Sequence, residues 1–148
     1  MGNLIEQVKI SQVITPTNGA AGTSDINSSI LDMSGFQGVA FVVTMGAITS
    51  GAVTSIKVQQ GAAADMSDAA DLEGSAQTIA DTDDEKVFVS DVFRPRERYV
   101  RLVVDRGTQN AVVSAANALQ YGPMKTPVSA HGTGVNAEQF VSPAEGTA

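Results

Sequence analysis

The stretch that decides the fold is Val39-Ala40-Phe41-Val42-Val43-Thr44-Met45, in which every second residue is large and apolar. Side chains along a β-strand point alternately to opposite faces, so an apolar period of two predicts a strand. The residues in between are Ala, Val and Thr, and we expect both faces of this strand to be buried.

The surrounding run from Met33 to Ile56 contains no charged residue. Glycines and polar residues interrupt it too often for the roughly 20 apolar residues of a membrane span. Two strands joined by a Gly-rich turn at 46–51 are the better interpretation, and no contact with a membrane is expected. The first residues, 1–6, also lack the pattern of a secretory signal.

The same period of two recurs on both sides of this run. Further strands are expected at 4–14, 54–60, 77–80, 86–93, 99–104 and 111–120. Turn signals separate these segments, and no long helical pattern lies between them. About seven short strands at this spacing predict an all-β fold, an antiparallel β-sandwich of jelly-roll-like type. Between Gly61 and Gly74 the chain is rich in Ala, and we expect a loop with a short helix there.

Residues 123–148 differ in composition from residues 1–122. They hold three of the five prolines and few large apolar residues, so they cannot bury enough surface to fold alone. We therefore divide the chain into a β-sandwich domain, 1–122, and an extended C-terminal arm, 123–148. Two interpretations of the arm stay open: a frayed tail, or a segment that becomes ordered against a neighbouring subunit.

The composition excludes several classes of function. The formal net charge is −7, which is the wrong sign for a protein that binds nucleic acid by neutralising phosphates. There is no cysteine, and His131 is the single histidine, so disulfides, thiol catalysis and multi-histidine metal sites are excluded. No nucleophile, base and orienting group come together in the sequence, so we expect no enzyme, no catalytic residue and no cofactor.

A run of carboxylates at 81–85, Asp-Thr-Asp-Asp-Glu, has the ligand type that calcium prefers. It lacks the glycine and the distal glutamate of an EF-hand loop, and a solvated turn before the next strand is the favoured interpretation. We predict no metal site, while calcium binding at this turn stays open.

Charges are segregated along the chain. Acidic residues concentrate between 65 and 91, and all five arginines fall between 94 and 106. The two blocks either lie on adjacent strands and neutralise each other, or the arginines serve an intermolecular interface, where their planar guanidinium groups pair well with carboxylates. The candidate interface residues are Arg94, Arg96, Arg98, Arg101, Met124, Val128, Phe140 and Val141.

Four segments, taken in order, resemble one family. Residues 29–51 contain the pattern Asp-x-x-Gly-Phe-x-x-Val followed by a hydrophobic strand and a Gly-rich hairpin. A strand at 54–60, an Asp- and Ser-rich loop at 65–72 and a strand at 98–104 follow. This order is similar to that of the capsid decoration (cement) proteins of tailed bacteriophages. The loop departs from the family in having Met66 and Leu72 where an aromatic residue is common.

The resemblance implies a structural virion protein without catalytic activity. Its expected partners are the major capsid protein and further copies of itself, as a dimer or trimer, and its expected location is the capsid surface, after assembly in the host cytoplasm. Two alternatives stay open. One is a head–tail joining or tail-surface protein; the other is a carbohydrate-binding module, which would need exposed aromatic rings among its five Phe and two Tyr.

Overall fold

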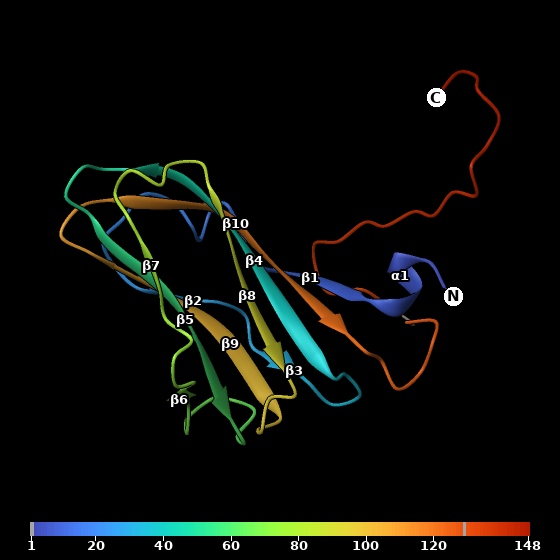
Figure 1. Cartoon of the computed structure of the whole chain (residues 1–148), viewed down its shortest axis with the longest axis horizontal. Coiled ribbons are helices and arrows are strands. Elements are labelled where there is room, and N and C mark those ends of the chain that lie inside the picture. Colours follow the sequence, from blue (N-terminus) through green and yellow to red (C-terminus); the bar gives the residue numbers. More distant parts are fainter. Residues whose placement is uncertain (1, 129) are drawn as a thin grey trace.

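The computed structural model describes residues 2–128 and 130–148. Two antiparallel sheets pack face to face, which confirms the predicted all-β sandwich (Figure 1). Sheet A has four strands in the order β1 (Lys9–Ile14), β10 (Ala111–Tyr121), β4 (Gly38–Ile48) and β8 (Val87–Phe93).

Sheet B is built around two long central strands, β9 (Tyr99–Gly107) and β5 (Val53–Gly61), which pair with each other. Only short strands flank them. The short strands are β2 (Ile26–Asn27) and β3 (Leu31–Asp32) beside β9, and β6 (Ala70–Asp71) and β7 (Gln77–Ile79) beside β5. The chain crosses repeatedly between the sheets, so strands adjacent in sequence, such as β4 and β5, lie in different layers.

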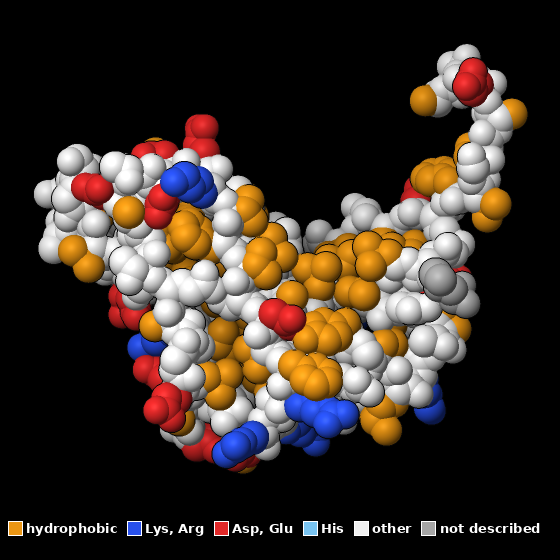
Figure 2. Space-filling view, viewed as in Figure 1, with side chains coloured by type: hydrophobic (Ala, Val, Ile, Leu, Met, Phe, Trp, Pro, Cys, Tyr) orange, Lys and Arg blue, Asp and Glu red, His pale blue; other side chains and the backbone are white. Residues whose placement is uncertain are grey.

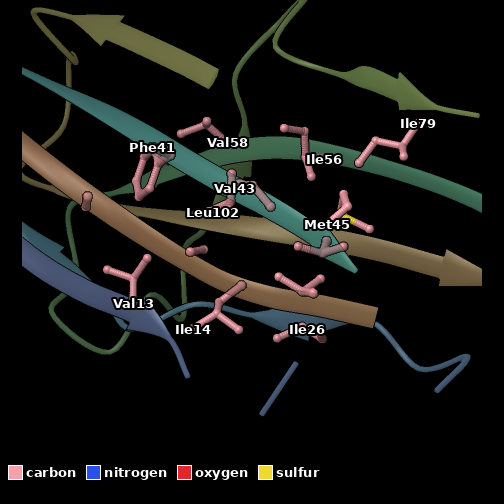
Figure 3. Close-up of a cluster of buried hydrophobic side chains, with 14 of the residues drawn as sticks. Val13, Ile14, Ile26, Phe41, Val43, Met45, Ile56, Val58, Ile79 and Leu102 are labelled. Carbon is pink, nitrogen blue, oxygen red and sulfur yellow. The ribbon is translucent and has the colours of Figure 1, made fainter. Parts of the chain in front are cut away.

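The core lies between the inner faces of the two sheets (Figure 3). Phe41 and Val43 of β4 are fully buried there, opposite Ile56 and Val58 of β5 and Leu102 of β9. These are the alternate apolar residues from which the strands were predicted, and their burial supplies the main stabilisation of the sandwich.

The expectation that both faces of 39–45 are buried was only half correct. Ala40, Val42 and Thr44 lie on the outer face of sheet A and remain partly exposed. Their small or β-branched side chains fit a pleated surface whether or not another layer covers it, so the alternation alone could not show that one face is open.

Two local predictions were wrong. Residues Leu4–Gln7 form a helical turn, α1, instead of the start of a strand; the carboxylate of Glu6 accepts a hydrogen bond from the backbone N–H of Asn3, which closes this turn. Between 61 and 74 the described chain forms turns and β6 but no helix. There Asp68 accepts bonds from the backbone N–H groups of Ala62 and Ala63, and such local bonds compete with helix formation.

In the described ranges 2–128 and 130–148, no helix is long and apolar enough to cross a membrane. The charge-free run from 33 to 56 forms β4, a tight turn and β5, as the sequence predicts.

Candidate interface

The two outer faces of the sandwich differ in polarity. On sheet A the strand register aligns rows of outward side chains across all four strands. One row joins Ile10, Leu119, Ala40 and Asp91, and the next joins Gln12, Asn117, Val42 and Val89. Most of these residues are apolar, and hydrophobic side chains form a broad band on the face shown in Figure 2.

Sheet B is polar on its outer face. Lys57 of β5 lies 3.1 Å from Asp71 and 3.7 Å from Asp105. Next to it, the guanidinium of Arg101 donates to the side-chain oxygen of Gln59. Gln59 and Lys57 together hold the pKa of Asp71 below its usual value through hydrogen bonds and charge. This face is well satisfied by its own contacts, so the apolar face of sheet A is the stronger candidate for a partner.

Tyr121 lies across the outer face of sheet A and ties β10 to β8. Its hydroxyl donates a 2.6 Å hydrogen bond to Asp91, the acidic residue of the apolar face. Burial of the phenol, followed by this bond and the nearby negative charge, raises the pKa of Tyr121 to about 12. Asp91 therefore has a partner within the chain and does not interrupt the apolar face with a free charge.

Three of the candidate arginines lie in the connection between β8 and β9, at one end of the sandwich. Arg94, Arg96 and Arg98 are exposed and border a depression of about 440 Å³ whose floor includes Phe36. The guanidinium of Arg98 makes two hydrogen bonds to Asp32, of 3.0 and 2.9 Å. Those bonds are the main reason that the pKa of Asp32 is lowered.

Arg94 and Arg96 have no acidic partner in the described part of the chain. Arg94 instead stacks against the ring of Phe93, with its guanidinium carbon 5.0 Å from the ring centroid. The backbone N–H of Arg96 donates to the side chain of Gln60. These two guanidinium groups are free to pair with carboxylates of another molecule.

Met124 and Val128 border a second depression, of about 510 Å³, beside the first. The two depressions share Ser34 and Phe36 as lining residues. The structure therefore brings five of the candidate interface residues together at one end of the molecule. We call this the end surface: Arg94, Arg96, Arg98, Met124 and Val128.

The other three candidates lie elsewhere. Arg101 is on the outer face of sheet B, bonded to Gln59. Phe140 and Val141 lie far along the arm, with 71% and 88% of their surface exposed. In Figure 1 this part of the arm runs away from the sandwich towards the C-terminus.

The first part of the arm is attached to the domain. The backbone N–H of Val128 donates to the carbonyl of Glu6, and that of Gly132 donates to the carbonyl of Ile10. In return the N–H of Ile10 donates to Nδ1 of His131. These bonds cover the free edge of β1, and they give the single histidine of the chain a structural role.

The acidic block does not neutralise the arginines. Among residues 2–128 and 130–148, the one arginine in a salt bridge is Arg98, and its partner Asp32 lies outside the acidic block. The hypothesis that the two blocks pair on adjacent strands was therefore wrong. The acidic side chains instead accept backbone bonds in loops: Asp81 from Gly51, Asp83 from Ala80 and Asp84 from Ile48.

The carboxylates of the 81–85 turn are thus used to hold neighbouring loops. In the described ranges, no three His, Asp or Glu side chains converge on a point that could hold a metal ion. The aromatic side chains are also dispersed. Phe41 is buried, Tyr121 is bonded to Asp91, and the two most exposed rings, Phe93 and Phe140, lie on a strand of sheet A and on the arm.

The exposed apolar side chains on the outward side of β8 were not predicted from the sequence. Val87, Val89 and Phe93 are 56%, 52% and 59% exposed, although they lie in a predicted strand. A signal was available. Residues 87–93 carry apolar side chains at odd as well as even positions, so both sides of this strand are largely apolar. At the edge of a sheet, the outward side of such a strand is exposed unless a partner covers it.

Comparison with known proteins found no match, either among protein-family models or among curated proteins.

Proposed function

We propose that this protein is a capsid decoration protein, which binds the outside of an icosahedral phage head and stabilises contacts between major capsid subunits. The observation that carries the proposal is the arm. The beginning of the arm is hydrogen-bonded to β1 through Gly132, while Phe140 and Val141 lie on an extended segment and are exposed to solvent. Such a segment gains free energy when a neighbouring subunit covers it, because apolar surface leaves water.

The end surface supports the same function. Arg94 and Arg96 offer two unpaired guanidinium groups beside the apolar rims of two depressions. A surface of this kind suits a protein partner that supplies carboxylates and apolar side chains. Each contact of this kind is weak by itself. When arms link many such contacts over a shell, the overall affinity becomes high.

The order of the strands and the crossings between the sheets support the jelly-roll-like arrangement expected from the sequence. Contacts of the arm beyond Val135 and self-association as a dimer or trimer are parts of the same proposal. A sandwich of this kind carries many different functions, so the fold does not select one. The resemblance in the sequence and the chemistry of the end surface are what favour binding to a capsid.

The deciding experiment is co-sedimentation with heads of the phage that encodes the chain, prepared without this protein. Saturable binding at a copy number comparable with the major capsid subunit supports a decoration protein. Binding of only a few copies, or binding to tails alone, contradicts it and favours a joining or tail-surface protein.

Three variants connect the binding to the structure. Removal of residues 135–148 and the double change R94E/R96E should each lower occupancy on heads. R101E is the control for charge reversal at another place, with one reversed charge in place of two. Arg101 lies on the outer face of sheet B, so this change should leave occupancy unchanged. Equal occupancy for all variants would show that neither the arm nor the end surface makes the contact.

A further inference from the structure

The strand β8 leaves one row of its backbone groups without partners. The carbonyl of Lys86 accepts a bond from Met45 of β4, and the N–H of Arg94 donates to Gln37 just before β4. Even-numbered residues of β8 therefore direct their N–H and C=O groups towards β4. The odd-numbered residues direct theirs to the opposite side, which is the free edge of sheet A.

At that free edge, in the described part of the chain, one group has a partner. The side-chain amide of Gln77 donates to the carbonyl of Val89 at 2.8 Å. The remaining N–H and C=O groups of the odd-numbered residues of β8 have no partner in the described chain. These groups form a template for another strand. On pairing, the carbonyl of Val89 would accept a bond from that strand in addition to, or in place of, the bond from Gln77.

The other sheet edges are protected. The edge of β1 is covered by His131 and Gly132 of the arm, and the carbonyl of Val13 accepts a further bond from Ser29. The edges of sheet B consist of strands of only two or three residues, which is a common way of blunting an edge. Among the edges described, β8 is the long one without a paired strand. The segment 71–77 lies beside it and reaches it through the side chain of Gln77, which bonds Val89 and Ser90.

The side chains of β8 also lack the usual protection. The strand contains no Pro, Lys or Arg, and its register with β4 runs without a bulge from Phe93 to Val87. Its outward residues include Val87 and Val89, both more than half exposed. Its one acid, Asp91, is bonded to Tyr121. A regular edge of seven residues, with three of its four outward side chains apolar, is suited to pairing.

The charges at the two ends of β8 select the partner. Asp83, Asp84, Glu85 and Lys86 precede the strand, with Lys86 paired to Asp83 at 2.6 Å, so this end keeps a net negative charge. Arg94 and Arg96 follow the strand. When two copies of β8 lie antiparallel, the acidic end of each strand meets the arginines of the other. A parallel pair would place like charges together, which is unfavourable.

We infer that the free edge of β8 pairs antiparallel with β8 of a second copy of this chain, so that the two A sheets form one continuous sheet across a twofold axis. The contact is isologous, because each copy offers the same residues. Val87, Val89 and Phe93 then extend one apolar face across both molecules. The inference deepens the self-association included in the proposed function and can fail without capsid binding failing.

The test is the molar mass of the full chain in solution, measured by sedimentation over a range of concentrations. The wild-type chain should reach twice its 15.2 kDa mass. V89K should raise the dissociation constant by about tenfold or more, since it places a lysine in the middle of each edge strand, and a lysine there opposes edge-to-edge pairing. V53K is the matched control: Val53 is also an exposed valine, at 66%, and lies at the start of β5, away from this edge.

Charge reversal tests the antiparallel direction. R94E should weaken the dimer, and E85R/R94E should restore part of the loss, because the two ends of the strands then again carry opposite charges where they meet. In amide hydrogen exchange, the N–H groups of Val87, Val89, Asp91 and Phe93 should be slowed at concentrations where the dimer forms.

Three results would overturn the inference. The first is a wild-type chain that stays monomeric at concentrations near 1 mM, the weak end of specific association. The second is a dimer that V89K leaves intact while its melting curve matches that of V53K. The third is a dimer abolished by removal of residues 135–148, which would identify the arm of the second copy as the occupant.

Discussion

The hydroxyl of Tyr121 bonds the carboxylate of Asp91 at 2.6 Å across the width of the intervening strand β4. Gly38 is the β4 residue paired with Tyr121, and it has no side chain to block the ring. A Cβ atom built at Gly38 would overlap the phenol of Tyr121. The link between the two outer strands therefore depends on the glycine beneath it.

Gly38→Ala should displace Tyr121 and lower the free energy of unfolding by about 1–3 kcal/mol, the usual cost of overpacking. Urea unfolding measures this change. Gly107→Ala is the control, since a Cβ there meets nothing closer than 3.9 Å. If Tyr121 is the cause, Gly38→Ala should cost much less in a Tyr121→Ala background; an equal cost in both backgrounds would place the strain elsewhere.

Tyr121 should also make stability depend on alkaline pH. Its pKa is raised from 10.0 to about 12 in the folded protein. A raised pKa contributes stability that is fully present below pH 10 and is lost as the pH rises towards 12. The melting temperature of the wild type should decrease between pH 10 and pH 12. The part of this decrease that comes from Tyr121 should be missing in Tyr121→Phe. Parallel curves for the two proteins would contradict the assignment.

The pair Asp32–Arg98 should act at the other end of the pH scale. The bonds from Arg98 lower the pKa of Asp32 below 3.8. A lowered pKa contributes stability that is present above pH 3.8 and is lost as the pH falls through the folded-state value. Asp32→Asn should therefore lower the melting temperature at pH 6, and the gap to wild type should narrow towards pH 2. A gap that is constant with pH would mean that the charge of Asp32 is irrelevant.

The attachment of the arm to β1 should be sensitive to position 132. A Cβ at Gly132 would overlap the side chain of Ser11, so Gly132→Val should push the arm away from the strand. We expect faster proteolysis within 123–148, measured by mass spectrometry, with the sandwich domain intact. Gly146→Val is the control, because nothing lies within 4 Å of a Cβ at that position. Equal cleavage rates would show that the bonds at Ile10 are not what holds the arm.

The sequence predicts the sandwich because burial imposes a period of two on each central strand. Phe41 and Val43 lie in the core as expected, and so do Ile56 and Leu102. The short strands β2 and β3 were missed, since two residues are too few to show any period. The helical turn α1 was missed because it is only four residues long, and its sequence signal, the Glu6 carboxylate, lies in a segment that also suits a strand.

Less of the candidate interface could be predicted. The end surface gathers residues 94–98 with Met124 and Val128, which are about 30 positions apart and meet only through the loop at 33–37. The arginine cluster was visible in the sequence, whereas the lack of acidic partners for Arg94 and Arg96 in the described part of the chain was not. That depends on where the aspartates point. Here Asp83 accepts a bond from its own turn, at Ala80, and Asp81 and Asp84 accept bonds from Gly51 and Ile48 of the neighbouring turn.

The cover that the arm lays over β1 has a consequence for how far copies of this chain can associate. A sheet that is open at both ends accepts a new molecule on each side, and nothing stops such growth before a fibre forms. Here His131 and Gly132 occupy one end. In the β8 pairing inferred above, edge-to-edge association would therefore be complete at two molecules, and the product would be a finite building block.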